Sequence, residues 1–387
     1  MSRPGRTRVV GVDLARALAL VGMYAAHLTT ARSPGSIGGV DPLFQVVAGR
    51  SSALFAVLAG VGIVLSSRVG TGRDAGDAGA ARRRLAVRAG LVAALGLALG
   101  SVDSGLAVIL TFYGLLFLCA LPVLTWRARS LAWLAVAWGL LSPVLSLVLR
   151  RQLDPVPKIV PALEHLAQPL VLAQELLLTG YYPVLTWATY LFAGMALGRL
   201  DLRSSGVATR LARAGGWLAA LTIVLSYYLT SRPSVRAALL ADPRQPVSGW
   251  GELDTQLRVG LYGTHPTGTP WWLAVWAPHS GSVMDLAHTV GSSVFVLGLC
   301  LWLVHLTPVL PWATLAGAGT MTLTLYSTHV LVLASPLDQD GGAALAVHTL
   351  ASLAIGAVFV RMGLKGPLEQ LLTSTSSALA GGRRDHP

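Results

Sequence analysis

The sequence predicts an all-α, polytopic membrane protein with about ten transmembrane helices. The chain of 387 residues is 53% hydrophobic, only 12% of it is charged, and its mean hydropathy is +0.63. A typical soluble domain is about 25% charged, so this composition excludes one. No linker is long enough to separate soluble domains, and residues 1–387 are therefore expected to form a single transmembrane domain.

Ten apolar segments define the predicted helices. Each is close to the length of about 20 residues that crosses the hydrocarbon core of a bilayer. They cover residues 9–30, 51–67, 86–102, 105–125, 131–149, 182–199, 214–231, 286–306, 312–335 and 343–361. The first follows a basic start, as a signal peptide does. It is nevertheless of membrane length and contains Asp13 and Arg16, so we expect it to be retained.

The basic residues predict the orientation of these helices. The net charge is +12, and most of the 29 Lys and Arg residues fall on one side of the predicted membrane, with the densest run at Arg82, Arg83 and Arg84. The positive-inside rule assigns that side, and both termini, to the cytoplasm. Orientation and contact with membrane lipids account for the excess charge, so no nucleic-acid partner is expected.

Arginine greatly outnumbers lysine, and Ala, Gly and Leu dominate the chain. Such a bias is typical of a bacterial genome rich in GC. We therefore expect a multi-pass protein of the bacterial cytoplasmic (inner) membrane.

Three longer segments are predicted to lie outside the cell: residues 31–50, 150–181 and 232–285. The third is the longest and contains Trp250, Trp271, Trp272 and Trp276. Tryptophan at this level is typical of an interfacial belt. A stacking platform for a sugar is the functional alternative, because long outer loops often cover a substrate.

The first predicted helix carries Asp13, Arg16 and His27. Eleven residues at 100° each bring His27 to within about 20° of Arg16, and the two are separated by roughly 16 Å along the axis. Charged residues in a membrane helix are costly and usually face a polar cavity. A neutral imidazole is a suitable general base, whereas a buried guanidinium binds an anion or a carbonyl group. The alternatives are a structural histidine and a structural Asp13–Arg16 pair.

Two further helices carry polar candidates. His329 and Tyr326 lie in the ninth helix, with His329 at the same outer depth as His27. The second helix begins with Arg50, Ser51 and Ser52, where a helix N-terminus could hold an oxyanion or a polar acceptor. Helix capping and interfacial contact are the structural alternatives.

Several segments together resemble membrane acyltransferases. Asp-x-x-Arg followed by ten residues and His, from Asp13 to His27, resembles the first helix of acyltransferase family three, and GRSSALFAVLAGVGIVLSS (49–67) is similar to the second. Three further segments resemble the heparan-α-glucosaminide N-acetyltransferase branch of that superfamily: TGYYPVLTWATYLFAGMALGRLDL (179–202), AGAGTMTLTLYSTHVL (316–331) and GPLEQLL (366–372).

This resemblance implies an enzyme that moves an acyl group from cytoplasmic acyl-CoA, with acetyl-CoA expected, to a hydroxyl or amine of an extracytoplasmic glycan or glycolipid. Together with the candidates above, it leads us to expect His27 as base, Arg16 and Asp13 at the donor, His329 as a further catalytic residue, and Arg50, Ser51, Ser52 and Tyr326 as binding residues. It also suggests a homodimer. The heparan-type enzymes place their catalytic histidine in the loop after the first helix, but residues 28–50 here contain none.

Two other functions stay open. A transporter or lipid flippase could use the same polar cavity, with His27 and His329 relaying protons. A non-catalytic membrane partner of a cell-envelope enzyme is the third reading. The sequence contains no HExxH, paired-cysteine, GxSxG or P-loop motif, and no metal is expected.

Overall fold

The computed structural model describes residues 8–31, 39–67, 69–71, 78–153, 158–306, 312, 314–337 and 340–380. Within these ranges the chain is helical or irregular and contains no β-strand, so the all-α class is confirmed. The helices are α1 (Val10–Leu28), α2 (Pro42–Val47), α3 (Arg50–Ser67), α4 (Ala78–Gly100), α5 (Leu110–Ala120), α6 (Ala128–Arg151), α7 (Pro169–Gln174), α8 (Val184–Gly198), α9 (Ser205–Thr230), α10 (Pro233–Leu240), α11 (Trp250–Val259), α12 (Val283–Leu306), α14 (Thr322–Leu333), α15 (Gly342–Arg361) and α16 (Pro367–Ala380). Short 3-10 helices occupy η3 (Leu163–Ala167), η5 (Pro270–Ala274) and η6 (Ala318–Thr320), and η4 (Glu175–Thr179) is a π-helix.

Several of these helices can cross a membrane. Among the described residues, five spans are long and apolar enough: α1, α2 with α3, α6, α12 and α15. A sixth results if α9 and α10, bent by 82° at their junction, form one broken span. Each of the ten predicted segments overlaps a helix, but three of these helices, α5, α8 and α14, are apolar and shorter than a span, and α4 carries several arginines. Ten crossings and cytoplasmic termini therefore stay predictions.

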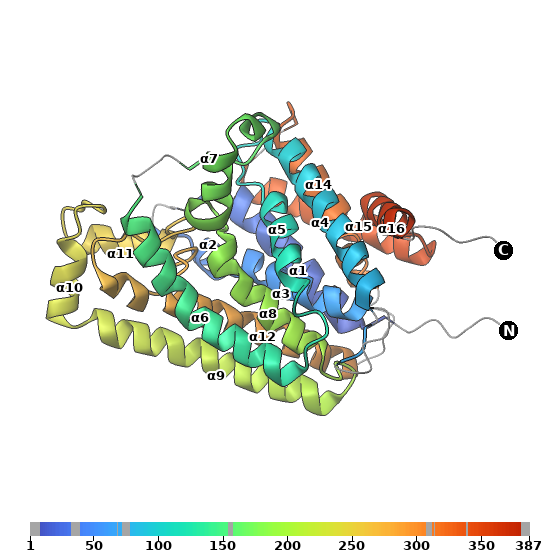
Figure 1. Cartoon of the computed structure of the whole chain (residues 1–387), viewed down its shortest axis with the longest axis horizontal. Helices are drawn as coiled ribbons and strands as arrows, with labels where there is room; N and C mark the ends of the chain where they lie inside the picture. The colour runs from blue at the N-terminus through green and yellow to red at the C-terminus, as the bar shows by residue number, and fades with distance from the viewer. Residues whose placement is uncertain are drawn as a thin grey trace.

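The helices pack in close pairs around α1. The most extensive contacts join α9 to α12, α3 to α8, α4 to α5 and α6 to α8, while α1 lies against α3, α12 and η6 (Figure 1). Glycines permit the α3–α8 approach: a Cβ on Gly194 would lie 1.9 Å from the carbonyl oxygen of Val57. Small residues are the usual means by which membrane helices approach this closely.

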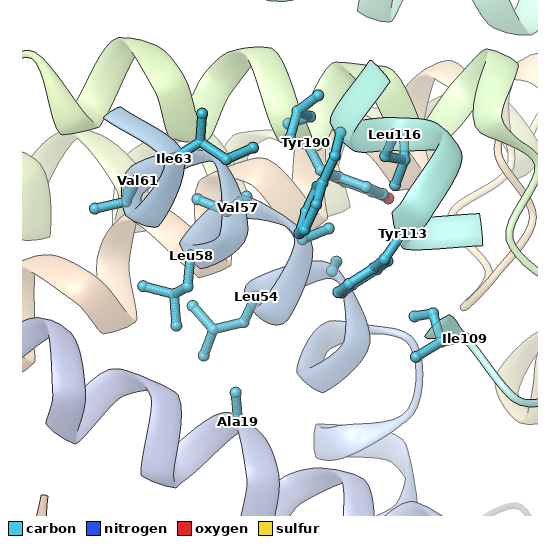
Figure 2. Packing of buried hydrophobic residues seen from close by; sticks show 14 of the residues in the cluster. Ala19, Leu54, Val57, Leu58, Val61, Ile63, Ile109, Tyr113, Leu116 and Tyr190 are labelled. Atoms are coloured by element: carbon cyan, nitrogen blue, oxygen red, sulfur yellow. The ribbon is translucent and has the colours of Figure 1, made fainter. Parts of the chain in front are cut away.

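The start of α3 is part of the buried apolar core. Figure 2 shows Leu54 and Leu58 directed toward Ala19 of α1, with Tyr113 of α5 on the other side. The Tyr113 hydroxyl donates to the carbonyl oxygen of Ser52 at 3.1 Å, which fixes α5 against the first turn of α3.

The ninth predicted helix, 312–335, is not one continuous helix in the described residues. Gly317 and Gly319 coincide with a turn and η6, and α14 begins only at Thr322. Glycine is a poor helix former, and a Cβ on Gly319 would lie 1.8 Å from the carbonyl oxygen of Asp13. The break places η6 against α1 close to Asp13.

The N-terminus of α14 is capped by a residue that lies more than 40 positions later in the sequence. Glu369 of α16 accepts hydrogen bonds from the Leu323 amide at 2.8 Å and from the Thr324 hydroxyl at 2.6 Å. A carboxylate at a helix N-terminus satisfies free amides and favours the helix dipole. Glu369 belongs to the Gly-Pro-Leu-Glu segment, whose position thus helps to set the position of α14.

The segment 232–285, predicted as an outer loop, folds into a cap with a core of its own. It contains α10, α11 and η5, and the buried apolar side chains of its core are Val235, Leu239, Leu253, Leu257, Trp272, Val275 and Ala277. Asp242 accepts hydrogen bonds from the Trp272 indole at 2.5 Å and from the Gly268 amide at 3.0 Å. α10 and α16 lie at opposite ends of the molecule (Figure 1).

Candidate active site

Three histidines from three helices form a hydrogen-bonded chain. His27, in the last turn of α1, has Nδ1 3.1 Å from Nε2 of His329 on α14. Nδ1 of His329 in turn lies 3.0 Å from Nδ1 of His348 on α15. The Tyr24 ring packs on His329 with ring centroids 4.4 Å apart, and its hydroxyl lies 3.0 Å from the Ser352 hydroxyl. The two outer histidines that the sequence placed at one depth are therefore in direct contact.

The positions of the protons in this series of hydrogen bonds determine whether His27 can accept a proton from a substrate. Each hydrogen bond requires one ring nitrogen to carry hydrogen and the other to accept it. If Nδ1 of His27 donates to His329, then His329 must donate to His348 through its own Nδ1. In that arrangement Nε2 of His27 has a free lone pair, and no described residue forms a hydrogen bond with it. In this tautomer His27 can act as a general base through Nε2, whereas the reverse direction of both hydrogen bonds would place hydrogen on that nitrogen.

His27 also lines a cavity of about 540 Å³. Ser51, Ser52 and Tyr326 line it with His27, from α3 and α14. The Ser52 hydroxyl donates to the carbonyl oxygen of Gly49, and the Tyr326 hydroxyl accepts from the Ile109 amide at 3.4 Å. The structure therefore brings four of the sequence-predicted residues to one cavity.

A further part of the cavity lining comes from the two segments, 150–181 and 232–285, that the sequence predicted to lie outside the cell. The residues concerned are Lys158, Tyr181, Tyr182, Tyr262 and His279. The ammonium group of Lys158 donates to the carbonyl oxygens of Leu261 and Tyr262. Burial lowers the pKa of Lys158 to about 8, with the Glu175 carboxylate acting in the opposite direction. Lys158 is therefore mainly protonated at neutral pH.

Asp13 and Arg16 lie away from that cavity. The Arg16 guanidinium is 3.2 Å from Asp13, which also lies 3.4 Å from Arg8. A Cβ on Gly62 would lie 2.5 Å from Nη2 of Arg16, so the guanidinium lies directly on α3. About a quarter of the Arg16 side chain remains exposed (26%), so it retains access for a ligand.

Arg50 belongs to a second, smaller cavity of about 140 Å³. Its Nε donates to Nε2 of His288 at 3.0 Å, and its guanidinium lies 5.0 Å from the centre of the Trp276 ring. Nη1 donates to the carbonyl oxygens of Gln45 and Ala48. The structure thus separates Arg50 from Ser51 and Ser52, with which the sequence had grouped it.

Sequence reasoning passed over His348 and His279. His348 lies in an apolar helix and looks like an isolated interfacial residue; only the packing of α15 beside α14 reveals its contact. His279 lies in a long loop, where sequence spacing carries no information about distance. No group of three or more His, Cys, Asp or Glu side chains suited to a metal occurs among the described residues.

Comparison with known families supports the acyltransferase resemblance. Residues 8–233, more than half of the chain, match the family described as heparan-alpha-glucosaminide N-acetyltransferase, catalytic. The chain belongs to this family. No curated protein matches the sequence. The matched range contains α1 and α3, and thus His27, Arg16 and the two serines, whereas His329 and His348 follow it. The protein is accordingly a helical, multi-pass member of a membrane acetyltransferase family.

Proposed function

We propose that the protein transfers an acetyl group from cytoplasmic acetyl-CoA to an extracytoplasmic glycan or glycolipid in the bacterial inner membrane, with His27 as general base. The observation that carries this proposal is the orientation of His27: one ring nitrogen is held by His329, and the other is left for a substrate beside a cavity of about 540 Å³. Family membership supports acetyl transfer as the reaction.

The proposed reaction needs one proton acceptor. Nε2 of His27 takes the proton from the acceptor group, whose oxygen or nitrogen attacks the thioester carbonyl carbon. The carbon–sulfur bond breaks, and the CoA thiolate receives the proton from His27. A base in this role typically contributes about 10²–10⁴-fold to the rate.

Arg16 and Asp13 are proposed to act at the donor. Arg16 lies roughly 16 Å from His27 along α1, which suits the phosphates of a CoA molecule whose pantetheine arm extends toward His27. Asp13 holds the guanidinium at 3.2 Å. Ser51, Ser52 and Tyr326 supply hydroxyl groups around the thioester, and other acyl chains are open as donors.

Arg50 is the weakest member of the proposed binding set. Its guanidinium already has three partners: His288 and the carbonyl oxygens of Gln45 and Ala48. Arg50 therefore stays in the proposed binding set as a residue of the second cavity, beside His288 and Trp276. The family resemblance is also the basis for proposing a homodimer.

A decisive test is CoA release by the purified protein in lipid nanodiscs. Wild-type protein and His27→Gln are given acetyl-CoA, and free thiol is measured with and without a glycan extract. We expect slow release that depends on His27 and rises with acceptor. Absence of any His27-dependent release across several acyl-CoA donors would contradict the proposal. Solute movement across vesicles without CoA consumption would instead favour the transporter.

A further inference from the structure

The part of the His27 cavity that is lined by loop residues contains an uncommon backbone conformation. Tyr262 has φ +50° and His279 has φ +56°, and they are the two non-glycine residues with positive φ in the described chain. Both line the same cavity as His27. Side chains in this left-handed region cost free energy, and such strain concentrates at functional sites.

The backbone around these two residues is held in place. The Leu261 amide donates to the carbonyl oxygen of Pro278 at 2.9 Å, and the Gly263 amide donates to that of His279 at 2.6 Å. Lys158 binds the same turn through the carbonyl oxygens of Leu261 and Tyr262. Hydrogen bonds among Lys158, residues 261–263 and residues 278–279 therefore hold the two strained conformations. They also fix the positions of the Tyr262 and His279 backbones at the cavity.

Aromatic neighbours fix the position of the His279 ring, but its nitrogen atoms lack hydrogen-bond partners among the described residues. It lies parallel to Trp187 with centroids 6.3 Å apart and meets Tyr182 edge-on at 5.7 Å. No described residue forms a hydrogen bond with either ring nitrogen. Burial, together with the charges of Lys158, His27 and Arg50, lowers the pKa of His279 to about 4. A neutral imidazole offers one donor and one acceptor, which matches a hydroxyl group.

The remaining lining suits a sugar ring rather than an ammonium group. Tyr262 is half exposed (50%) and, with Tyr181, offers an aromatic face to the apolar face of a pyranose. Among the described lining residues, none is an aspartate or glutamate, and Lys158 is positively charged near neutral pH. Glu175 lies behind Lys158, where it accepts hydrogen bonds from Ile159 and Thr179. An ammonium group would enter this cavity without a carboxylate partner, which is costly.

From these observations we propose that Tyr262 and His279 form the acceptor subsite, and that the group acetylated there is a hydroxyl of a pyranose. Tyr262 stacks on the sugar ring, and His279 hydrogen-bonds a hydroxyl while His27 accepts the proton that is lost. The inference rests on the proposed acetyl transfer, and it selects ester formation over amide formation.

Two matched acceptors test it: methyl β-D-glucopyranoside and methyl 2-amino-2-deoxy-β-D-glucopyranoside, which differ only at C2. Each is incubated at millimolar concentration with radiolabelled acetyl-CoA and the protein in nanodiscs, and the product is treated with alkali, which cleaves esters but not amides. We expect labelled ester from the glucoside. Amide as the main product, or neither glycoside acetylated nor altering CoA release, would overturn the proposal.

Variants separate a binding role from a structural one. His279→Gly keeps the left-handed backbone and should lower transfer to the glucoside by about tenfold more than CoA release without acceptor, with partial recovery in His279→Asn. Tyr262→Gly should raise the acceptor KM by about fivefold while the melting temperature stays level or rises. His305→Ala, at an exposed position of α12, is the matched control and should change none of these values.

The outcomes are distinguishable from failure of the proposed function. Loss of His27-dependent CoA release in the wild-type protein would refute acetyl transfer itself. Intact release, with transfer to the glucoside unaffected by His279→Gly, would refute only the acceptor subsite. Equal loss of transfer and release in that variant, accompanied by a lower melting temperature, would assign His279 a structural role and equally overturn it.

Discussion

His27 and His288 lie on different helices of the same bundle and have opposite surroundings. Nδ1 of His27 is bound to His329, and its Nε2 has no described partner beside a cavity of about 540 Å³. Both nitrogens of His288 are occupied: Nε2 accepts from Arg50 at 3.0 Å, and Nδ1 lies 3.2 Å from the carbonyl oxygen of Ala219. The comparison teaches that an intramembrane histidine is a candidate for catalysis when its partners leave one nitrogen unused.

The largest effect is expected at these two positions. His27→Ala should lower kcat for acetyl transfer by about 10²–10⁴-fold, because the general base is lost. His288→Ala, the matched control, should keep kcat within about threefold, since it removes no group placed at the reacting atoms. Rates in nanodiscs, normalised to folded protein, measure both. Similar losses in the two variants would remove the distinction between the histidines.

The orienting role of His329 sharpens the comparison. His329→Leu removes the hydrogen bond to His27 at similar volume and should lower kcat by about 10–100-fold, as is typical when the partner of a functional histidine is lost. His329→Gln retains a side chain that can both donate and accept, and should recover part of the rate. His348→Leu, one link further away, should have a smaller effect. Unchanged kcat in His329→Leu would show that His27 needs no orienting partner.

The hydrogen bonds that join His288 to Arg50 and Ala219 should contribute to the free energy of unfolding. Arg50→Met leaves His288 Nε2 without its donor and should lower the free energy of unfolding by about 1–3 kcal/mol. Adding His288→Leu should restore part of that loss, because both polar partners are then removed. Melting curves of the single and double variants measure the coupling. A double variant with strictly additive loss would mean that the two side chains do not act as a pair.

A third histidine, His265, gives the smallest effect and involves pH. It is buried in the cap, and burial, assisted by the charge of Arg150, lowers its pKa to about 3. The unfolded chain takes up this proton near pH 6.5, whereas the folded chain takes it up only near pH 3. The stabilisation is therefore complete above pH 6.5 and is lost as the pH falls toward 3.

His265→Asn should flatten this acid-dependent part of the stability. The expected change is about 2–4 °C in the difference between melting temperatures at pH 6.5 and pH 4.5. The exposed His305 provides the control, since His305→Asn should leave that difference as it is in the wild type. If the melting temperature of His265→Asn fell between pH 6.5 and pH 4.5 as much as that of the wild type, other groups would be the cause of the acid sensitivity.

The sequence by itself determined the all-α class and the family resemblance, because both depend on local properties. Apolar length predicts a helix regardless of its neighbours, and the Asp13–Arg16–His27 spacing lies within one helix whose periodicity is known. The depth shared by His27 and His329 could also be predicted, since both lie toward the same end of their segments.

Only the tertiary structure decided which polar groups meet. Arg50 is next to Ser51 in the chain, yet a helix turns by about 100° per residue, so the two side chains face different cavities. The break before α14 coincides with Gly319, which contacts α1, and Gly317, which contacts α15, and Glu369 caps the helix that follows. His279 reaches the cavity of His27 through loop conformation, and hydrophobic periodicity contains no information about the path of a loop.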